Sequence, residues 1–243
     1  MAGGKVYEIG GSDAESFLQG LVSNDLARLK DGLVYAALLS PQGKYLADFF
    51  LARRGDAILL DVAPVLAAAT VQRLGMYRLR ADVTIAESEL SVIRTGDPEG
   101  ALADPRHPSL GHRRYGPPGP DELPDPLPLR VAHCIPESGV ELIPNESYIL
   151  ECGFERLHGV DFRKGCYVGQ EVTARMKHKT ELRKGLVTVE IEGAAPVGTE
   201  ILAGGKPAGV LFSQHGGQAI AYLRHDRAGE GMRAGDAVVN WRG

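Results

Sequence analysis

The chain has 243 residues, of which 44% are hydrophobic and 24% are charged, as in an ordinary soluble globular protein. The net charge of −4 excludes a protein that attracts nucleic acid over its whole surface, so any anion site must be local. Three cysteines without a CxxC motif exclude a disulfide framework and give no support for a metal site. No run of about 18 apolar residues is present that could span a membrane. We therefore expect no membrane contact.

The first predicted element is a helix that begins at a capping box formed by Ser12 and Glu15. Its apolar stripe continues to Leu21. Strand-like runs follow at residues 34–39, 45–51 and 57–62, and the sequence Ser-Pro-Gln-Gly at 40–43 predicts a turn between the first two. This region is typical of a helix packed on a sheet.

A second helix is predicted from Pro64 through Leu74, which Gly75 weakens or closes, and strands are predicted at 83–87 and 90–93. The mixture predicts an α+β fold. Nine of the fifteen prolines lie between residues 98 and 128, which predicts a long surface connection there, because proline disrupts helix interiors and central strands.

Beyond this connection we expect a helix over 147–152, a tight turn at 165–167 and a short helix over 170–176. Five short apolar runs separated by glycine-rich turns predict a small C-terminal β-barrel. The predicted organisation is an N-terminal α+β half, a proline-rich connection, a second α+β segment and the barrel, at residues 1–95, 96–129, 130–181 and 182–243.

The densest chemical cluster runs from residue 163 to residue 184 and holds seven Lys or Arg residues against two acids. It is either a solvated basic face or a surface that attracts an anion such as a folate tail or RNA phosphates. Within it lies Cys166, whose thiolate the neighbouring Lys164 would favour. A small buried residue is the alternative, and one thiolate cannot hold a cluster without ligands from a partner.

Several further polar residues could have either a structural or a functional role. Glu171 and Arg175 are spaced for an ion pair on a helix, or Glu171 accepts hydrogen bonds from a pterin. Asp48 lies in an apolar strand, so it is either paired or faces a cavity. The remaining candidates for ligand contact, each with a capping or structural alternative, are Asn24, Asp25, Tyr77 and Arg78.

The string Lys164-Gly165-Cys166-Tyr167-Val168-Gly169-Gln170-Glu171, extended by Arg175, resembles the signature of the YgfZ family. These are folate-binding relatives of the glycine cleavage T-protein, and a mitochondrial iron–sulfur assembly factor belongs to the same group. The similarity continues at 17–26, 40–48, 79–83, 135–145 and from 209 onward. It therefore covers most of the chain except the proline-rich middle.

The resemblance implies an aminomethyltransferase-like cloverleaf around a central folate channel. It also implies tetrahydrofolate or a derivative as cofactor, and an accessory role in assembling or repairing iron–sulfur proteins, including enzymes that modify tRNA. A cluster would be held only transiently, and assembly proteins and client enzymes would be partners. Cys166 would be the functional thiol, with Asp48 as the second catalytic candidate. Residues implied at the folate are Lys164, Tyr167, Gln170, Glu171 and Arg175.

One departure from the catalytic relatives bears on enzymatic activity. T-proteins carry adjacent aspartates where this chain has Ala47-Asp48, which disfavours glycine cleavage. A folate-dependent one-carbon transferase stays as one alternative, and an RNA-binding module as another, although few aromatic residues accompany the basic stretch. The family members imply the bacterial cytoplasm, or the mitochondrial matrix for a trimmed eukaryotic chain.

Overall fold

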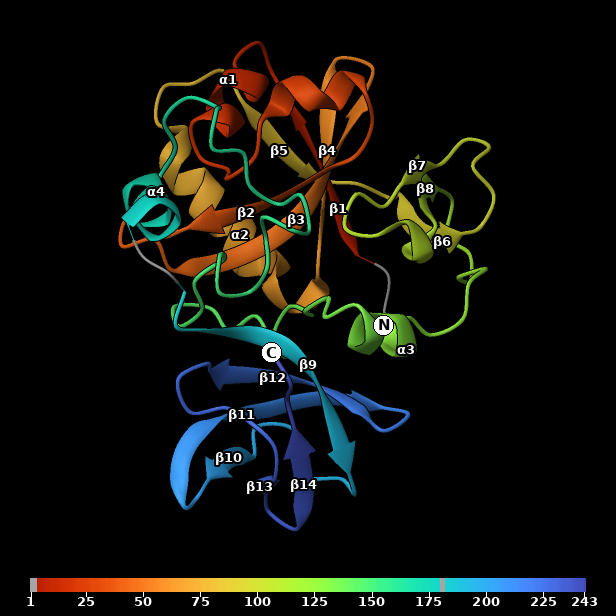
Figure 1. Ribbon diagram of the computed structural model, residues 1–243. Coiled ribbons are helices and arrows are strands. Elements are labelled where there is room, and N and C mark those ends of the chain that lie inside the picture. Colours follow the sequence, from red (N-terminus) through yellow and green to blue (C-terminus); the bar gives the residue numbers. More distant parts are fainter. Residues whose placement is uncertain (1–3, 180–181) are drawn as a thin grey trace.

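The computed structural model describes residues 4–179 and 182–243, and its strands form three sheets (Figure 1). The first sheet is antiparallel, with the strand order β2-β3-β4-β1-β5. Its strands are β1 (Lys5–Gly10), β2 (Val34–Leu39), β3 (Tyr45–Arg54), β4 (Ala57–Val62) and β5 (Thr84–Glu87). All six residues of β2 are buried, so this apolar strand lies in the core although it is at the edge of the hydrogen-bonded order.

Two helices and a 3₁₀ turn accompany this sheet, namely α1 (Ala14–Gln19), η1 (Leu26–Lys30) and α2 (Pro64–Arg78). The predicted capping box is wrong, because the Ser12 hydroxyl donates to Asp82 and Asp13 takes the N-cap position. Of the two effects predicted for Gly75, weakening or closing the second helix, closing does not occur, since α2 runs to Arg78. The helix continues for one more turn because Leu74 packs into the core and leaves Gly75 facing open space.

The proline-rich region contributes most of the second sheet, which the sequence did not predict. Its strands are β6 (Ser91–Thr95), β7 (Leu102–Ala103) and β8 (His112–Gly116), in the order β6-β8-β7, with η2 (Pro108–Leu110) between the last two. The prolines flank β7 and β8 and do not interrupt them, so both strands keep their hydrogen bonds. This small sheet projects to the right in Figure 1.

The segment between the second sheet and the barrel is mostly irregular. It contains α3 (Leu127–Ala132) and α4 (Gln170–Lys179). The helix predicted over 147–152 is absent and consecutive turns take its place, with Gly153 at φ +78°. Ile149, Leu150 and Cys152 are all buried there, because these turns fill the space beneath the first sheet. None of the helices in the described ranges is long and apolar enough to cross a membrane.

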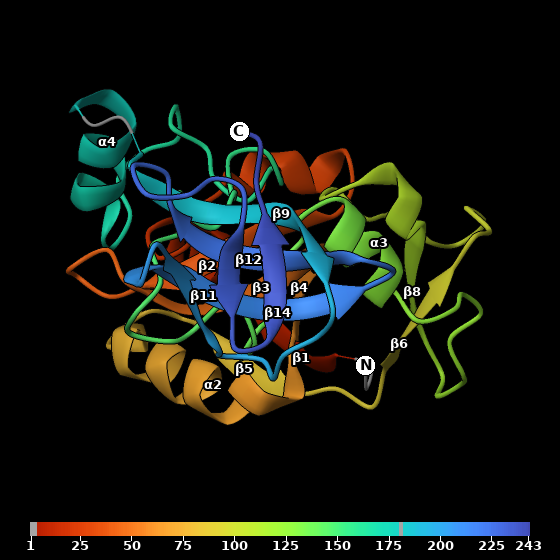
Figure 2. The ribbon, with the colours of Figure 1, turned by 60° about the horizontal axis from the view of Figure 1, so that its bottom comes forward.

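The C-terminal part is a closed six-stranded barrel, as predicted, with the order β10-β11-β12-β9-β14-β13. Figure 2 shows it in front of the first sheet, with α2 to one side and the second sheet to the other. Fully buried side chains such as Leu211, Leu223 and Val239 fill its interior. The strands are β9 (Lys184–Glu192), β10 (Glu200–Ala203), β11 (Lys206–His215), β12 (Gln218–Arg224), β13 (Met232–Ala234) and β14 (Ala237–Asn240).

Candidate functional site

A cavity of about 280 Å³ lies between the first sheet, the second sheet and the segment before the signature. Phe49 and Phe50 of β3, Val92 of β6 and Pro136 form its apolar walls. Four guanidinium and four carboxylate groups also line it, so the wall has no net charge. These charged residues are Asp48, Asp61, Arg94, Arg106, Arg113, Asp121, Arg130 and Glu137.

Asp48 lies in this wall and is only 6% exposed. Its Oδ1 accepts hydrogen bonds from the hydroxyls of Tyr45 at 2.5 Å and Ser138 at 2.6 Å, and its Oδ2 accepts one from Tyr35 at 2.9 Å. Burial, reinforced by the Asp48 charge, raises the pKa of both phenols, so they stay protonated and donate. A carboxylate offers about four acceptor positions, which leaves one on Oδ2 without a protein donor among the described residues.

The charged groups beside the cavity are held in buried ion pairs. Arg113 donates to Asp61 Oδ2 from Nε at 2.9 Å and from Nη2 at 2.5 Å. Burial lowers the pKa of the Arg113 guanidinium, but the Asp61 carboxylate raises it by more, so the pKa lies above its ordinary value. The guanidinium carbon lies 4.2 Å from the centre of the Phe50 ring, and that of Arg106 lies 4.7 Å from it. Stacking and ion pairing together fix this wall.

The signature turn is tied to the end of α1 and the segment that follows it through Lys164. Its ammonium donates to three main-chain carbonyl oxygens, those of Gln19 at 2.7 Å, Val22 at 2.5 Å and Asn24 at 3.0 Å. Burial lowers the pKa of Lys164 to about 8, against the opposing effect of nearby carboxylates. The lysine therefore holds the turn against the segment that follows α1.

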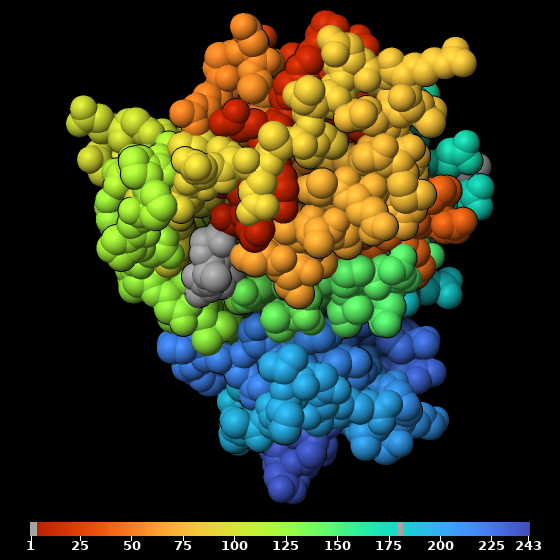
Figure 3. Space-filling model, turned by 180° about the vertical axis from the view of Figure 1, so that it is seen from behind, coloured from red at the N-terminus to blue at the C-terminus, as the bar shows by residue number. Residues whose placement is uncertain are grey.

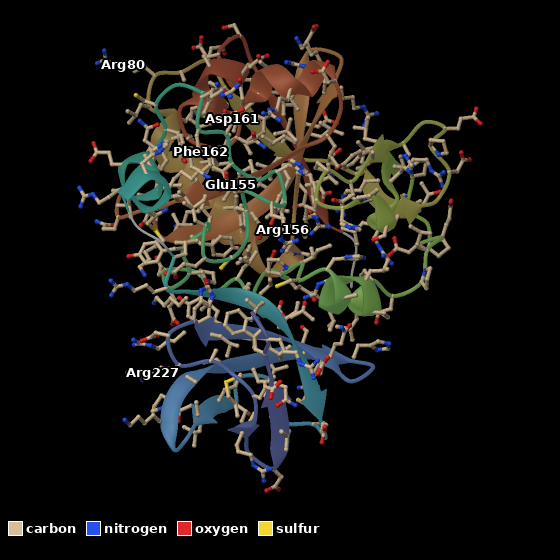
Figure 4. The ribbon with its side chains drawn as sticks, viewed as in Figure 1. Arg80, Glu155, Arg156, Asp161, Phe162 and Arg227 are labelled. Carbon is tan, nitrogen blue, oxygen red and sulfur yellow. The ribbon has the colours of Figure 1, made fainter. Side chains whose placement is uncertain are left out.

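A second tie comes from Asp161, in the strand-free segment that leads into the signature (Figure 4). Its Oδ1 accepts hydrogen bonds from the backbone N–H of Arg163 at 2.7 Å and Lys164 at 3.2 Å, and its Oδ2 pairs with Arg28 at 2.7 Å. Burial raises the pKa of Asp161, but these donors outweigh it and hold the pKa below its usual range. The carboxylate thus shapes the turn that begins the signature.

The far end of the signature packs on the β2–β3 turn through glycine. Gly169 has φ +83°, and a Cβ there would lie 2.5 Å from the carbonyl oxygen of Ser40. Gly43 faces it in the same contact, since a Cβ on Gly43 would lie 3.2 Å from the Gly169 oxygen. Close backbone approach therefore requires glycine at both positions.

Cys166 is exposed between these anchors, whereas Cys152 is buried and Cys134 is partly buried. Burial raises the pKa of the Cys134 thiol to about 11 and that of Cys152 to about 12. A Cβ added at Gly165 would meet nothing within 4 Å, so the space before Cys166 is open. Within residues 4–179 and 182–243 no group of three His, Cys, Asp or Glu residues could hold a metal ion.

Only Asp48 of the predicted site residues lines the cavity, and Cys166 does not. Asn24 is buried, and its amide donates to the main-chain oxygens of Tyr35 and His158 at 2.8 and 2.7 Å. Asp25 caps η1 by accepting from the Ala27 N–H. Both residues therefore have the structural roles that were the alternative to ligand contact.

The other predicted residues lie apart from the cavity as well. Tyr77 and Arg78 form the last turn of α2, and neither bonds Asp48, whose donors are Tyr35, Tyr45 and Ser138. Glu171 and Arg175 are exposed on α4 and form no ion pair among the described residues, so the ion-pair alternative for them is not realised. Folate contacts by Lys164, Tyr167, Gln170, Glu171 and Arg175 stay a prediction.

Two residues that shape these regions were missed. Asp61 carries the same sequence signal as Asp48, an acid within an apolar strand, and should have been selected with it. Arg113 lies in the proline-rich region, where no strand was predicted. Its contact with Asp61 depends on β8 reaching β4, which residue spacing does not reveal.

Comparison with known proteins agrees with this architecture. Residues 183–242 match the family model described as CAF17, C-terminal beta-barrel domain. The crystal structure of glycine cleavage system aminomethyltransferase T from Bartonella henselae superposes with a TM-score of 0.74 at 15% identity, covering 97% of this chain and 81% of that one. The aminomethyltransferase-like fold predicted from the sequence is thereby confirmed.

Curated relatives are similar over most of the chain. The mitochondrial iron–sulfur cluster assembly factor IBA57 of Mus musculus is 30% identical, over 92% of this chain and 76% of that protein. The human protein is 29% identical over 98% and 83%. The homolog from Mycosarcoma maydis is 32% identical over 75% of this chain and 54% of its own length. The chain spans about half the length of the fungal relatives it matches.

Proposed function

We propose that this chain, which belongs to the family of the iron–sulfur cluster assembly factor IBA57, presents Cys166 as a ligand to a cluster shared with a partner. The observation that carries the proposal is the exposure of Cys166 on a turn fixed at both ends. A thiolate that must reach a partner's cluster has to be accessible and held in place. The clients would be iron–sulfur enzymes, including those that modify tRNA.

The chemistry requires a second protein, because one thiolate cannot hold a cluster. Cys166 would donate one sulfur to iron, and the partner would supply the remaining ligands. Cys134 and Cys152 cannot assist without unfolding, since burial keeps both thiols protonated. The cluster is therefore cargo that passes between proteins. The names of the relatives say mitochondrial, and we propose the mitochondrial matrix or the bacterial cytoplasm as the compartment of this chain.

We also propose that the cavity takes the ring system of a reduced folate. Its volume of about 280 Å³ is just below the usual range for small-molecule sites, about 300–1,000 Å³, which suits a flat heterocycle and leaves the glutamate tail outside. Phe49 offers an apolar wall, and Asp48 has one acceptor position for a ring N–H or amino group. A bound tetrahydrofolate would supply a one-carbon carrier.

The position of Asp48 also favours a second candidate, a folate-dependent one-carbon transferase. An acid in the cavity wall is where such a reaction needs one. Incubation with tetrahydrofolate and an aminomethyl donor should yield methylene-tetrahydrofolate if this candidate is right. Tight folate binding without turnover would exclude the transferase and leave only the accessory role.

The thiol is tested by complementation of cells that lack the gene. Cys166→Ser should fail to restore the activity of iron–sulfur enzymes, while Cys134→Ser, which alters a thiol without surface reactivity, should restore it. Western blotting confirms that both variants accumulate equally. Full rescue by Cys166→Ser would remove the thiol from the mechanism.

The folate site is tested by titrating purified protein with tetrahydrofolate. Asp48→Asn should weaken binding at least about fivefold, the loss expected for a charge-assisted hydrogen bond, whereas Glu171→Ala should leave it unchanged. The opposite pattern would move the pterin from the cavity to the signature. No binding by the wild type would end the folate proposal but leave the role of Cys166 intact.

A further inference from the structure

One face of α2 is exposed and unusually apolar. Among the described residues, four large hydrophobic side chains are exposed, and three of them belong to this helix or its C-cap. Val65, which also lines the cavity, is 74% exposed, Met76 64% and Leu79 88%. Figure 3 shows α2, in orange to gold, as open surface on the back of the molecule. Clustering of this kind marks an interaction site more often than scattered single residues do.

The pattern of burial along α2 divides the helix into a core side and an outward side. Leu66, Ala67, Thr70 and Leu74 face the core. The exposed residues along one side of the helix are Val65, Ala68, Ala69, Gln72, Gly75 and Met76, followed by Leu79 just after its end, while Pro64 and Arg78 are exposed elsewhere on α2. A solvated helix would carry charges there, but only Gln72 is polar. Together these seven positions are called the α2 face below.

Three arginines border the α2 face. Arg78 and Arg80 are exposed at its C-terminal end, and Arg73 is half-buried beside it. In the described part of the chain none of the three forms an ion pair. No acid occurs between Asp61 and Asp82, in a chain that is negative overall. The face is thus apolar in the middle and positive at the rim.

We propose that the α2 face docks a helix of an acidic partner protein. The small residues Ala68, Ala69 and Gly75 allow a partner helix to approach closely, and Val65 and Met76 flank this flat region on either side. Acidic side chains on the partner would meet the bordering arginines. The surface is separate from Cys166 and extends the proposed function to a second contact.

Two other occupants fit less well. A second copy of the chain, packed with its own α2 face against this one, would offer no acid to Arg78 and Arg80, because residues 62–81 contain neither Asp nor Glu. A membrane surface would select bulky Trp, Phe or Leu side chains along the whole face, where this helix has alanine and glycine. Leu79, held at φ +44°, places one large apolar side chain at the positive rim and suits a protein partner better.

Photo-crosslinking in cells tests the proposal. A photoreactive residue replaces Met76 in the full chain, and the matched control replaces Val197, which is 56% exposed on the barrel. We expect an adduct at position 76 and none at 197, mapped by mass spectrometry to an acidic helix of another protein. Arg78→Glu with Arg80→Glu should reduce the adduct at least about fivefold, the loss of two exposed ion pairs, without lowering the unfolding temperature.

Four results would overturn the proposal. The first is equal labelling at positions 76 and 197. The second is an adduct with the mass of two copies of the chain, which would identify self-association. The third is flotation of the purified protein with phosphatidylglycerol vesicles that Met76→Asp abolishes, which would identify a membrane surface. The fourth is an adduct that persists in the variant with both charge reversals, which would show that the partner is not recognised through acidic side chains.

Discussion

The wall around Asp48 and the turn around Cys166 differ in how completely their polar groups are partnered. Asp48 accepts three hydroxyl bonds and lies beside buried ion pairs, so the cavity is rigid before any ligand arrives. Cys166 has fixed anchors on either side but open space around it. A preformed cavity suits a small molecule, and an anchored exposed thiol suits a macromolecule.

One hairpin connects the two regions. Strand β3 carries Asp48, and the turn between β2 and β3 supports Gly169 through backbone contact. Gly43 takes part in the same contact from the hairpin side. A ligand that shifts β3 therefore has a short physical route to the signature turn, although coupling has to be shown by measurement.

The largest expected contrast is the reactivity of the three thiols. At pH 8 iodoacetamide should modify only Cys166 in the native protein, because a thiol with a pKa of about 12 is ionised in roughly one molecule in ten thousand. Modification of Cys134 should rise about tenfold per pH unit up to its pKa of about 11. Peptide mapping distinguishes the sites, and urea should expose all three. Early labelling of Cys152 would contradict its burial.

The rigidity of the cavity wall is tested by Arg113→Ala. This change leaves Asp61, which is 2% exposed, as a buried charge without its cation, and breaking such a pair costs about 3–5 kcal/mol. Urea unfolding measures the loss. Lys5→Ala removes an exposed pair with Glu87 and should change little. Equal effects of the two substitutions would show that the wall is not preorganised by its ion pairs.

The anchoring of the signature is tested by two glycine substitutions. Gly169→Ala places a Cβ 2.5 Å from the Ser40 oxygen at φ +83°, so we expect a loss of about 2–3 kcal/mol. Gly165→Ala meets nothing within 4 Å and should be neutral within about 0.5 kcal/mol. The pair is matched because both residues flank Cys166. A neutral Gly169→Ala would mean that the β2–β3 turn does not support the signature.

The sequence predicted the regular parts of both regions and failed where distant segments meet. Strands β2 and β4 were predicted to the residue, since a short, continuous apolar run between turn residues is typical of a buried strand. The barrel and the α4 helix followed from glycine spacing and the signature. The strand β1 was missed, because its short run of alternating residues begins only five residues into the chain.

The candidate site was predicted less well than the fold. Asp48, selected as an acid out of place, lines the cavity, and Cys166 is exposed, but the roles predicted for both residues stay predictions. The signature was expected to surround the same pocket, but sequence adjacency to a cysteine says nothing of which cavity a residue faces. Arg106 and Arg113 reach the cavity from a proline-rich region whose strands depend on tertiary contacts.

The smallest expected effect concerns Lys164, the anchor that links the signature to α1. Lys164→Met removes the donor to three carbonyl oxygens and should cost about 2 kcal/mol, because only part of that hydrogen bonding is replaced by water. Since burial lowers the pKa of Lys164 to about 8, the unfolded chain binds more protons between pH 8 and about 10.4. The wild type should therefore gain stability relative to Lys164→Met as the pH rises through that window. Urea unfolding at pH 7 and pH 10 measures the free energy of unfolding of the wild type and of Lys164→Met. If the difference between the two proteins becomes smaller as the pH rises, the carbonyl oxygens hold the ammonium charged.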